Sequence, residues 1–284
     1  CHLARPMSQP AASRLLPTIA FIGGGNMASA IIGGLIHQGH PASQIEVVEP
    51  WAEAREALRK NYGIEAQAEA GPALQRAQIV VWAVKPQTFK DAAAQAKAHT
   101  QGALHLSVAA GIRSDSIAQW LGTERIVRTM PNTPALVGKG MSALYARPAV
   151  SAPERQSIEA IMATTGEFLW VDSEPQLDAV TALSGSGPAY VFYFLEAMTR
   201  AGTDMGLTAA QAHQLAVGTF VGASELARRS DETPAVLRQR VTSKGGTTYA
   251  ALQSMEHDAV AEKFMQAMQA ARQRAHELGD EFGK

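Results

Sequence analysis

The segment that decides the fold is Phe21-Ile22-Gly23-Gly24-Gly25-Asn26-Met27-Ala28. It follows an apolar run that predicts a β-strand and precedes a stretch that predicts a helix. Its Gly-x-Gly-x-x-Ala pattern therefore lies between a strand and a helix. Gly23 permits a tight turn, and Gly25 lets a pyrophosphate approach backbone N–H groups at the positive end of the helix dipole. Outside this context the glycines would indicate only a turn. In it, they predict a dinucleotide site that includes Ile22, Gly23, Gly24, Gly25, Asn26, Met27 and Ala28.

Short apolar runs alternate with helical stretches from residue 18 to about residue 171, which is the pattern of a parallel sheet covered by helices. Most of the runs are continuously apolar, as expected of strands buried on both faces. The predicted strands are residues 18–22, 45–49, 79–84, 104–108, 126–130, 142–146 and 167–171, and the predicted helices are 28–38, 52–61, 89–98, 114–121 and 153–164. We therefore predict an α/β dinucleotide-binding domain over residues 18–172, with a Rossmann-like doubly wound parallel sheet.

The strand pattern stops after residue 172, and helical patterns continue to the end of the chain. The breaker Ser184-Gly185-Ser186-Gly187-Pro188 predicts a helix from about Ala189, because proline is favoured in the first helical turn. That helix begins with seven residues that are apolar on every side. An all-helical domain over residues 173–284 can hardly enclose it alone, so a subunit interface is favoured over a central core helix.

Composition narrows the class of protein. The chain has 284 residues, 46% apolar and 18% charged, with 25 basic against 26 acidic residues, which is typical of a globular protein and does not favour a nucleic-acid partner. Its apolar runs are shorter than the roughly 18 residues that a membrane span needs. One cysteine, Cys1, allows no intrachain disulfide, which fits a cytoplasmic location. The composition of residues 1–17 suggests a flexible leader, and the eight histidines show no metal-ligand spacing.

Glu49 stands at the end of the second predicted strand, where a carboxylate can accept hydrogen bonds from an adenosine ribose. A negative charge there repels a 2′-phosphate, which favours NADH over NADPH. Arg55 and Arg59 on the next helix are within reach of such a phosphate, although solvated surface charges are the preferred interpretation for both.

Three more turns follow predicted strands and share the edge where open parallel sheets bind ligands. They contain Ala83, Val84, Lys85 and Pro86, then Ala109, Ala110 and Gly111, then Asn132 between two prolines. Lys85 either holds cofactor oxygens or is a solvated charge at the strand end. Together these small or stiff turns predict the pocket for a nicotinamide ring.

In the predicted helical domain, one segment has residues suited to bind a ligand: the loop Ser243-Lys244-Gly245-Gly246-Thr247-Thr248. Two glycines expose backbone N–H groups at a helix start, so a small carboxylate would fit there. A helix capped by Thr247 or Ser243 without any ligand is an equally good interpretation.

As a set, these segments resemble pyrroline-5-carboxylate reductase, the enzyme that makes proline. The resemblance covers residues 18–256 in the family's order, and its most specific part is the Ser-x-Gly-Gly-x-Thr loop. The matching segments are residues 21–27, 83–87, 109–112, 130–134, 184–190 and 241–252.

The resemblance implies a cofactor domain followed by a helical domain that interlocks with its twin in a homodimer, often within a larger ring. It implies that Ser243, Gly245, Gly246 and Thr247 hold the substrate carboxylate and that Thr248 makes the catalytic contact with the ring nitrogen. The cofactor would be NADPH or NADH. This chain differs from the family pattern at Glu49, where NADPH-preferring members often have small or polar residues, and at Ala70, where the family often has Asn near the adenine ribose. Both differences concern the choice of cofactor.

Two other functions stay open on the sequence. A β-hydroxyacid-type dehydrogenase would share the cofactor half and use a helix-borne lysine such as Lys263. A non-catalytic NAD(P)-binding sensor would need the glycine turn and not the loop of residues 243–248.

Overall fold

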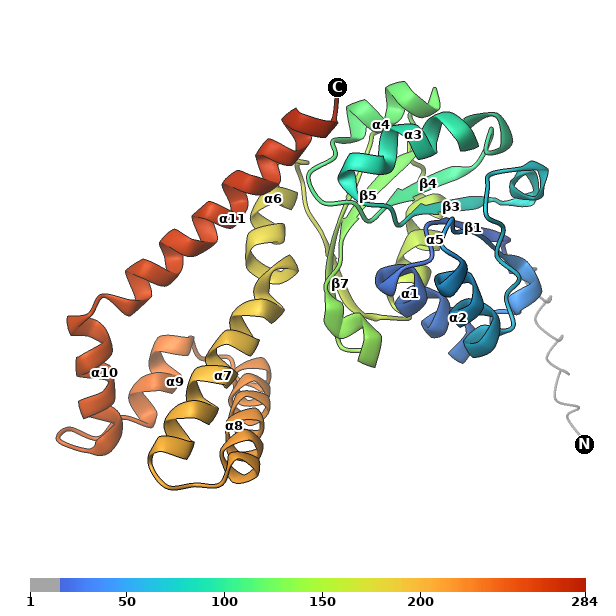
Figure 1. Ribbon diagram of the computed structural model, residues 1–284. Coiled ribbons are helices and arrows are strands. Elements are labelled where there is room, and N and C mark those ends of the chain that lie inside the picture. The colour runs from blue at the N-terminus through green and yellow to red at the C-terminus, as the bar shows by residue number, and fades with distance from the viewer. Residues whose placement is uncertain (1–15) are drawn as a thin grey trace, which may run out of the picture.

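The computed structural model describes residues 16–284, so the leader predicted over residues 1–17 lies outside the description except for Leu16 and Pro17. The chain folds into an α/β domain followed by a helical region, as the sequence predicts (Figure 1). A long final helix runs back from the helical region to the α/β domain, and its end lies beside α3 and α4.

The α/β domain is built on a seven-stranded sheet with the strand order β2-β1-β3-β4-β5-β6-β7. All seven predicted strands are present, with ends that shift by two residues or fewer. Strands β1 to β5 are parallel to one another. The strands are β1 (Ile19–Ile22), β2 (Ile45–Val48), β3 (Ile79–Trp82), β4 (Leu104–Ser107), β5 (Ile126–Met130), β6 (Gly140–Ala146) and β7 (Gly166–Trp170).

The prediction of a parallel sheet fails for the last two strands. Strand β6 is antiparallel to β5, and β7 is parallel to β6, so both run against the other five. The reason is the short connection of residues 131–139, which holds only the 3₁₀ turn η4 (Thr133–Val137) and no crossover helix. Between β6 and β7, by contrast, α5 (Ala152–Met162) supplies the crossover that a parallel pair requires.

Helices cover both faces of the sheet, because successive strand residues point to opposite sides. In β1, Ile19 and Phe21 pack with Ile31 in one core, whereas Ala20 and Ile22 belong to the second core. Each fully buried isoleucine or phenylalanine side chain stabilises the fold by about 1.5–3 kcal/mol. The first face is covered by α1 (Asn26–His37), α2 (Ala52–Tyr62) and α5, and the second by α3 (Pro86–Ala96), α4 (Ser114–Leu121) and η2 (Pro72–Arg76); η1 (Ala42–Gln44) and η3 (Lys97–His99) are short connecting turns.

The helical region forms an elongated arm (Figure 1). Helices α7 and α8 lie side by side, and Gly202 allows their close approach because a Cβ there would lie 2.9 Å from the Cβ of Ala212. The elements are α6 (Gln176–Val180), the π-helical turn η5 (Thr181–Gly185), α7 (Gly187–Asp204), α8 (Ala209–Arg229), α9 (Pro234–Arg240), α10 (Thr247–His257) and α11 (Val260–Phe282).

Helix α7 is not a central core helix of the single chain. Its Phe192 and Tyr193 are 62% and 71% exposed, and Leu215 and Val221 of α8 are similarly exposed. Such a concentration of large apolar side chains on a surface is typical of a protein–protein contact. The interface interpretation of this helix therefore fits the structure.

Helix α11 connects the arm to the α/β domain. Its 23 residues span about 34 Å at 1.5 Å per residue. Near its end, Asp280 accepts a 2.7 Å hydrogen bond from Arg113, and the carbonyl of Gly283 accepts a 2.6 Å hydrogen bond from Ser116. The end of the helical part is thus attached to the α/β domain, across the boundary predicted near residue 172.

Candidate active site

The predicted cofactor residues meet at one edge of the sheet, which we call the carboxyl edge. It consists of the turns that follow β1 to β5, whose carboxyl ends point the same way. Open sheets of this type bind ligands in the crevice outside this edge. The structure places there Ile22, Gly23, Gly24, Gly25, Asn26, Met27 and Ala28 after β1, Glu49 after β2, Ala83, Val84, Lys85 and Pro86 after β3, Ala109, Ala110 and Gly111 after β4, and Asn132 after β5.

The glycine turn has the geometry that a pyrophosphate needs. Gly23 has φ +97°, and a Cβ there would lie 2.3 Å from the carbonyl oxygen of Ala83, so only glycine fits. Gly25 has the opposite surroundings, since nothing lies within 4 Å of a Cβ placed on it. Helix α1 begins directly after Gly25 and has no side-chain cap. Its first N–H groups therefore face an open space that an anion can enter.

The carboxylate of Glu49 is held in a fixed position beside this turn. Its Oε2 accepts a 2.7 Å hydrogen bond from the N–H of Gly24, and its Oε1 accepts a 2.9 Å bond from the N–H of Trp51. The side chain is buried. Arg55 Nη1 donates to the carbonyls of Glu49 and Pro50 at 2.9 and 2.6 Å, so a cation lies at the turn that follows β2. Sequence reasoning missed these backbone partners and the exposed ring of Trp51.

Lys85 and Arg59 remain exposed charges in the structure. Lys85 precedes the first residue of α3 and caps it without a side-chain hydrogen bond. Arg59 pairs with Glu56 of its own helix at 2.5 Å, which fits its interpretation as a surface charge.

Gly111 has surroundings that sequence reasoning missed. Its φ is +77°, and a Cβ there would lie 2.6 Å from the carbonyl oxygen of Ala275 and 2.7 Å from Cβ of Leu278. The side of this glycine toward which a Cβ would point is therefore filled by α11. The small residue permits the close approach of that helix.

The side-chain amide of Asn132 is bonded to two backbone groups. Its Oδ1 accepts from the N–H of Met141 at 2.8 Å, and its Nδ2 donates to the carbonyl of Ser184 at 3.1 Å. An apolar groove of about 550 Å³ opens beside it, lined by residues that include Tyr190 and Phe264. Sequence reasoning placed Asn132 at the carboxyl edge and missed its contact with the helical region.

The loop predicted to hold a carboxylate starts α10 without a side-chain cap. The N–H of Gly246 donates to the carbonyl of Ser243 at 2.9 Å, and Gly245 has φ +74°. The helix begins at Thr247, and Gly246 occupies the capping position. The interpretation as a helix capped by Thr247 or Ser243 is therefore wrong, and the first N–H groups of α10 are available to an anion. The side chain of Thr248 is half-buried.

Within one chain this loop and the carboxyl edge do not meet. Helix α10 lies at the far end of the arm from the sheet (Figure 1). Helix α11 begins just after α10 and reaches Gly111 only with Ala275, so about 22 Å of helix separates the two places. The structure thus brings the predicted cofactor residues together and leaves Ser243, Gly245, Gly246, Thr247 and Thr248 apart from them.

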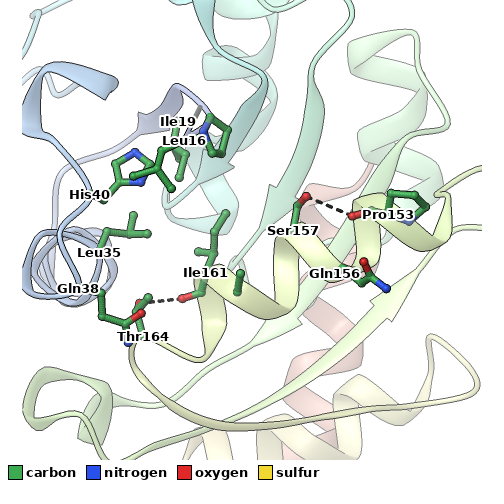
Figure 2. A pocket seen from close by; sticks show the side chains of 12 residues that line it. Leu16, Ile19, Leu35, Gln38, His40, Pro153, Gln156, Ser157, Ile161 and Thr164 are labelled. Carbon is green, nitrogen blue, oxygen red and sulfur yellow. Dashed lines mark hydrogen bonds between the residues drawn. The ribbon is translucent and has the colours of Figure 1, made fainter. Parts of the chain in front are cut away.

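A separate cavity of about 480 Å³ lies between α1 and α5 at the opposite edge of the sheet, near the start of β1 (Figure 2). It is lined by residues such as Leu35, His40 and Ile161, and burial lowers the pKa of His40. None of the predicted site residues lines it.

Within residues 16–284, no helix combines the length and apolar character that a membrane crossing needs. The same residues contain no group of three metal-ligating side chains that could hold an ion.

Comparison with known proteins identifies the family. Residues 174–278 match the family model described as pyrroline-5-carboxylate reductase dimerisation, and residues 18–111 match the one described as NADP oxidoreductase coenzyme F420-dependent. The pyrroline-5-carboxylate reductase of Pseudomonas aeruginosa is 45% identical over 270 residues, which cover 94% of this chain and 99% of that protein. The chain belongs to the pyrroline-5-carboxylate reductase family. The family's enzyme from Haemophilus influenzae is 40% identical over 92% of this chain and 97% of its own length.

Solved structures of the family have the same fold. The pyrroline-5-carboxylate reductase of Coxiella burnetii superposes with a TM-score of 0.84 at 37% identity and covers 93% of this chain and 98% of its own. The enzyme of Plasmodium falciparum, solved with NADP bound, gives a TM-score of 0.85 at 27% identity over the same shares of both chains. Family membership decides among the three functions that the sequence left open, in favour of a reductase that uses NAD(P)H.

Proposed function

We propose that this protein reduces the C=N bond of 1-pyrroline-5-carboxylate to L-proline, the last step of proline biosynthesis. The observation that carries the proposal is the uncapped Gly245-Gly246 start of α10, in a chain of this family whose glycine turn is open at Gly25. Residues 18–172 would bind the dinucleotide, and residues 173–284 would carry the dimer contacts and the substrate contacts.

The carboxyl edge offers backbone N–H groups that can bind the phosphates of a dinucleotide. The N–H groups at the start of α1 would hold the pyrophosphate, because their side of Gly25 is open. The turns with Val84, Lys85, Ala109 and Asn132 would flank the nicotinamide half. When bound, the reduced dinucleotide supplies the hydride, and the protein contributes position and electrostatics.

The loop before α10 would bind and orient the substrate. Backbone N–H groups of Gly245 and Thr247, with the hydroxyl of Ser243, would hold its carboxylate at the positive end of the helix dipole, and Gly246, whose N–H donates to Ser243, would leave room for the close approach. The Thr248 hydroxyl would form a hydrogen bond with the ring nitrogen. A threonine hydroxyl is a weak acid, so its role would be to orient the imine and relay a proton from solvent.

Each active site would combine two subunits. The separation of Thr248 from the carboxyl edge within one chain supports this arrangement, as do the exposed apolar side chains of α7 and α8. The glycine turn of one subunit would face the loop of its partner in a homodimer. Binding in that geometry lowers the barrier by placing the reactants in contact.

The fixed carboxylate of Glu49 supports a preference for NADH. Both of its oxygens are hydrogen-bonded to backbone N–H groups, so its negative charge cannot turn away from a 2′-phosphate. Arg55, which lies at the turn after β2, would offset part of this repulsion.

The direct test is the initial rate of NADH and NADPH oxidation by purified protein with and without 1-pyrroline-5-carboxylate. Substrate-dependent oxidation is expected with both cofactors and faster with NADH. Replacing Thr248 by Ala should lower turnover more than cofactor affinity, whereas T248S retains the hydroxyl and most of the rate.

Complementation tests the shared site. G25D puts a carboxylate into the open space at the glycine turn without a steric clash, so it should abolish cofactor binding and leave the fold intact. Coexpressed T248A and G25D chains pair at random, half of the dimers are mixed, and each mixed dimer has one intact site. About a quarter of the wild-type activity should therefore return. No recovery in dimers shown to be mixed would mean that each chain uses its own loop.

A further inference from the structure

The π-helical turn η5 leads into α7, and its residue Ser184 has a backbone carbonyl that accepts no hydrogen bond from the helix itself. In an α-helix, the carbonyl of Ser184 would accept the N–H of residue 188. Residue 188 is a proline and has no N–H. The next candidate, the N–H of Ala189, donates instead to the carbonyl of Ser186 at 3.0 Å. The hydrogen bond to Ser184 comes from Asn132 Nδ2 of the α/β domain, at 3.1 Å.

The π-helical turn η5 leaves a second carbonyl free. The N–H of Ser186 donates to the carbonyl of Thr181 at 2.7 Å, which is the i to i+5 register of a π-turn. The carbonyl of Ala182 therefore loses its usual partner and accepts the hydroxyl of Tyr190 at 2.8 Å. Tyr190 belongs to the helical region itself. Of these two side-chain hydrogen bonds, the one from Asn132 joins the two parts of the chain.

Asn132 is firmly attached on its own side. Its Oδ1 accepts the N–H of Met141 in β6, which closes the connection between β5 and β6. The two backbone partners require opposite ends of the amide, so they fix its orientation. Beside it, a Cβ on Gly185 would lie 2.6 Å from Cε of Met130, so η5 also packs directly on the end of β5.

This contact lies between two parts of the proposed active site. Asn132 belongs to the carboxyl edge, and η5 leads directly into α7, which carries the exposed Phe192 and Tyr193. In the proposed dimer, the partner's loop would approach the carboxyl edge through contacts on this arm. A shift between Asn132 and Ser184 would then change the spacing between the two halves of each active site.

We propose that Asn132 is a positioning residue for the reduction: its amide holds the Ser184 turn against the carboxyl edge and so sets the position of the arm relative to the bound dinucleotide. The inference rests on the proposed function. It assigns to Asn132 a role that acts through Ser184, in place of the direct cofactor contact that the sequence predicts.

The test compares N132D and N132A with wild-type protein. Asp keeps the acceptor for Met141 and replaces the donor by an oxygen that faces the Ser184 carbonyl, whereas Ala removes both groups without adding charge. Because a displacement of about 1 Å can cost 100-fold in rate, we expect kcat to fall by about 10- to 100-fold in both variants. For N132A, the dissociation constant of NADH should stay within about threefold of wild type. T133A alters the exposed neighbouring residue and should keep full activity.

Amide hydrogen exchange gives a readout without substrate or cofactor. In N132D and N132A, the amides of residues 181–190 should exchange faster than in wild type, while those of β1 and β3 keep their protection. If wild-type protein failed to reduce 1-pyrroline-5-carboxylate, the proposed function would be wrong, and exchange would still test the contact. Unchanged exchange over residues 181–190 would overturn the inference.

A second substitution separates positioning from local repair. P188A supplies an N–H in register with the Ser184 carbonyl. In N132D/P188A it should restore slow exchange over residues 181–190 and leave kcat low, because the link to the carboxyl edge is still missing. Recovery of kcat would show that Asn132 only satisfies a helix carbonyl.

NADH affinity tests the other interpretation of Asn132. If the NADH dissociation constant of N132A rose in step with the loss of kcat/KM, Asn132 would be a direct cofactor ligand. Either result, or an unchanged kcat, refutes the proposal.

Discussion

Glu49 and Gly24 are joined by a 2.7 Å hydrogen bond from the glycine N–H to the carboxylate Oε2. The bond links the end of β2 to the glycine turn after β1, two segments that would contact different parts of one dinucleotide. A Cβ on Gly24 would also lie 3.2 Å from Cβ of Glu49, so the two residues pack closely. Glu49 thus shapes the turn and places a negative charge beside it.

Replacing Glu49 by Gln should raise the kcat/KM ratio of NADPH over NADH by about tenfold. Near a protein surface, two like charges about 4 Å apart repel by roughly 1–4 kcal/mol, and Gln removes this repulsion. E53Q makes the same charge change on the exposed first turn of α2 and should leave the ratio nearly unchanged. Equal ratios in E49Q and wild type would exclude Glu49 from cofactor choice.

Gly111 should be far less tolerant of alanine than Gly102, although both have positive φ, +77° and +82°. At Gly102, nothing lies near a new Cβ, so G102A should cost only the backbone penalty of about 1–2 kcal/mol. G111A adds overlap with Ala275 and Leu278, for a total of about 3 kcal/mol. Urea unfolding of both variants measures the difference, and equal losses would contradict the close packing of α11.

His105 should make the protein less stable in mild acid. Burial, and to a smaller extent the charge of Arg125, lowers the pKa of His105 to about 4 from 6.5. Below pH 6.5 the unfolded chain binds a proton that the folded chain does not, so this contribution is complete above pH 6.5 and is lost as the pH falls toward 4. The loss approaches about 3 kcal/mol.

The variant H105N checks this effect. Its side-chain oxygen can still accept the 3.0 Å hydrogen bond that Trp82 Nε1 donates to His105 Nδ1, and it does not titrate. Unfolding free energies at pH 7.5 and 4.5 should differ less in H105N than in wild type. The same difference in both proteins would show that another group causes the acid sensitivity.

Glu174 should be essential to the contact between the two parts of the chain. Its Oε1 accepts from Arg128 Nη1 at 2.8 Å, and its Oε2 accepts from the hydroxyl of Ser114 at 2.6 Å. The side chain of Arg128 is only 5% exposed, so E174A leaves a buried cation unpaired and should cost about 3–5 kcal/mol. E174A/R128M removes that cation and should recover part of the loss in a urea titration. A double variant less stable than E174A would contradict this explanation.

The sequence predicts the strands well because their signal is local. Continuous apolar runs such as residues 79–84 mark buried strands, and the glycine turn is specified by Gly23 and Gly25 within a few residues. The reversed direction of β6 escapes this reasoning, because it depends on the length of the connection after β5 and on the absence of a helix there. Pattern alone does not distinguish that strand from its parallel neighbours.

The candidate site was predictable in its composition and not in its contacts. Residue type and position after a strand place Glu49 and Asn132 at the carboxyl edge. Their partners come from distant segments, as Ser184 does for Asn132, and no local pattern encodes them. For the same reason, no local pattern predicted that α11 packs against the side of Gly111 toward which a Cβ would point.

The packing of α11 against Gly111 has a consequence for how the protein folds during its own synthesis. During translation, the residues of the sheet leave the ribosome first, and domains usually begin to fold as they emerge. Here Ala275, Asp280 and Gly283 complete the surroundings of the turn after β4. A ribosome stalled before residue 275 would therefore expose a nascent sheet whose turn after β4 is still bare, and this protein should acquire its finished cofactor domain only late in synthesis.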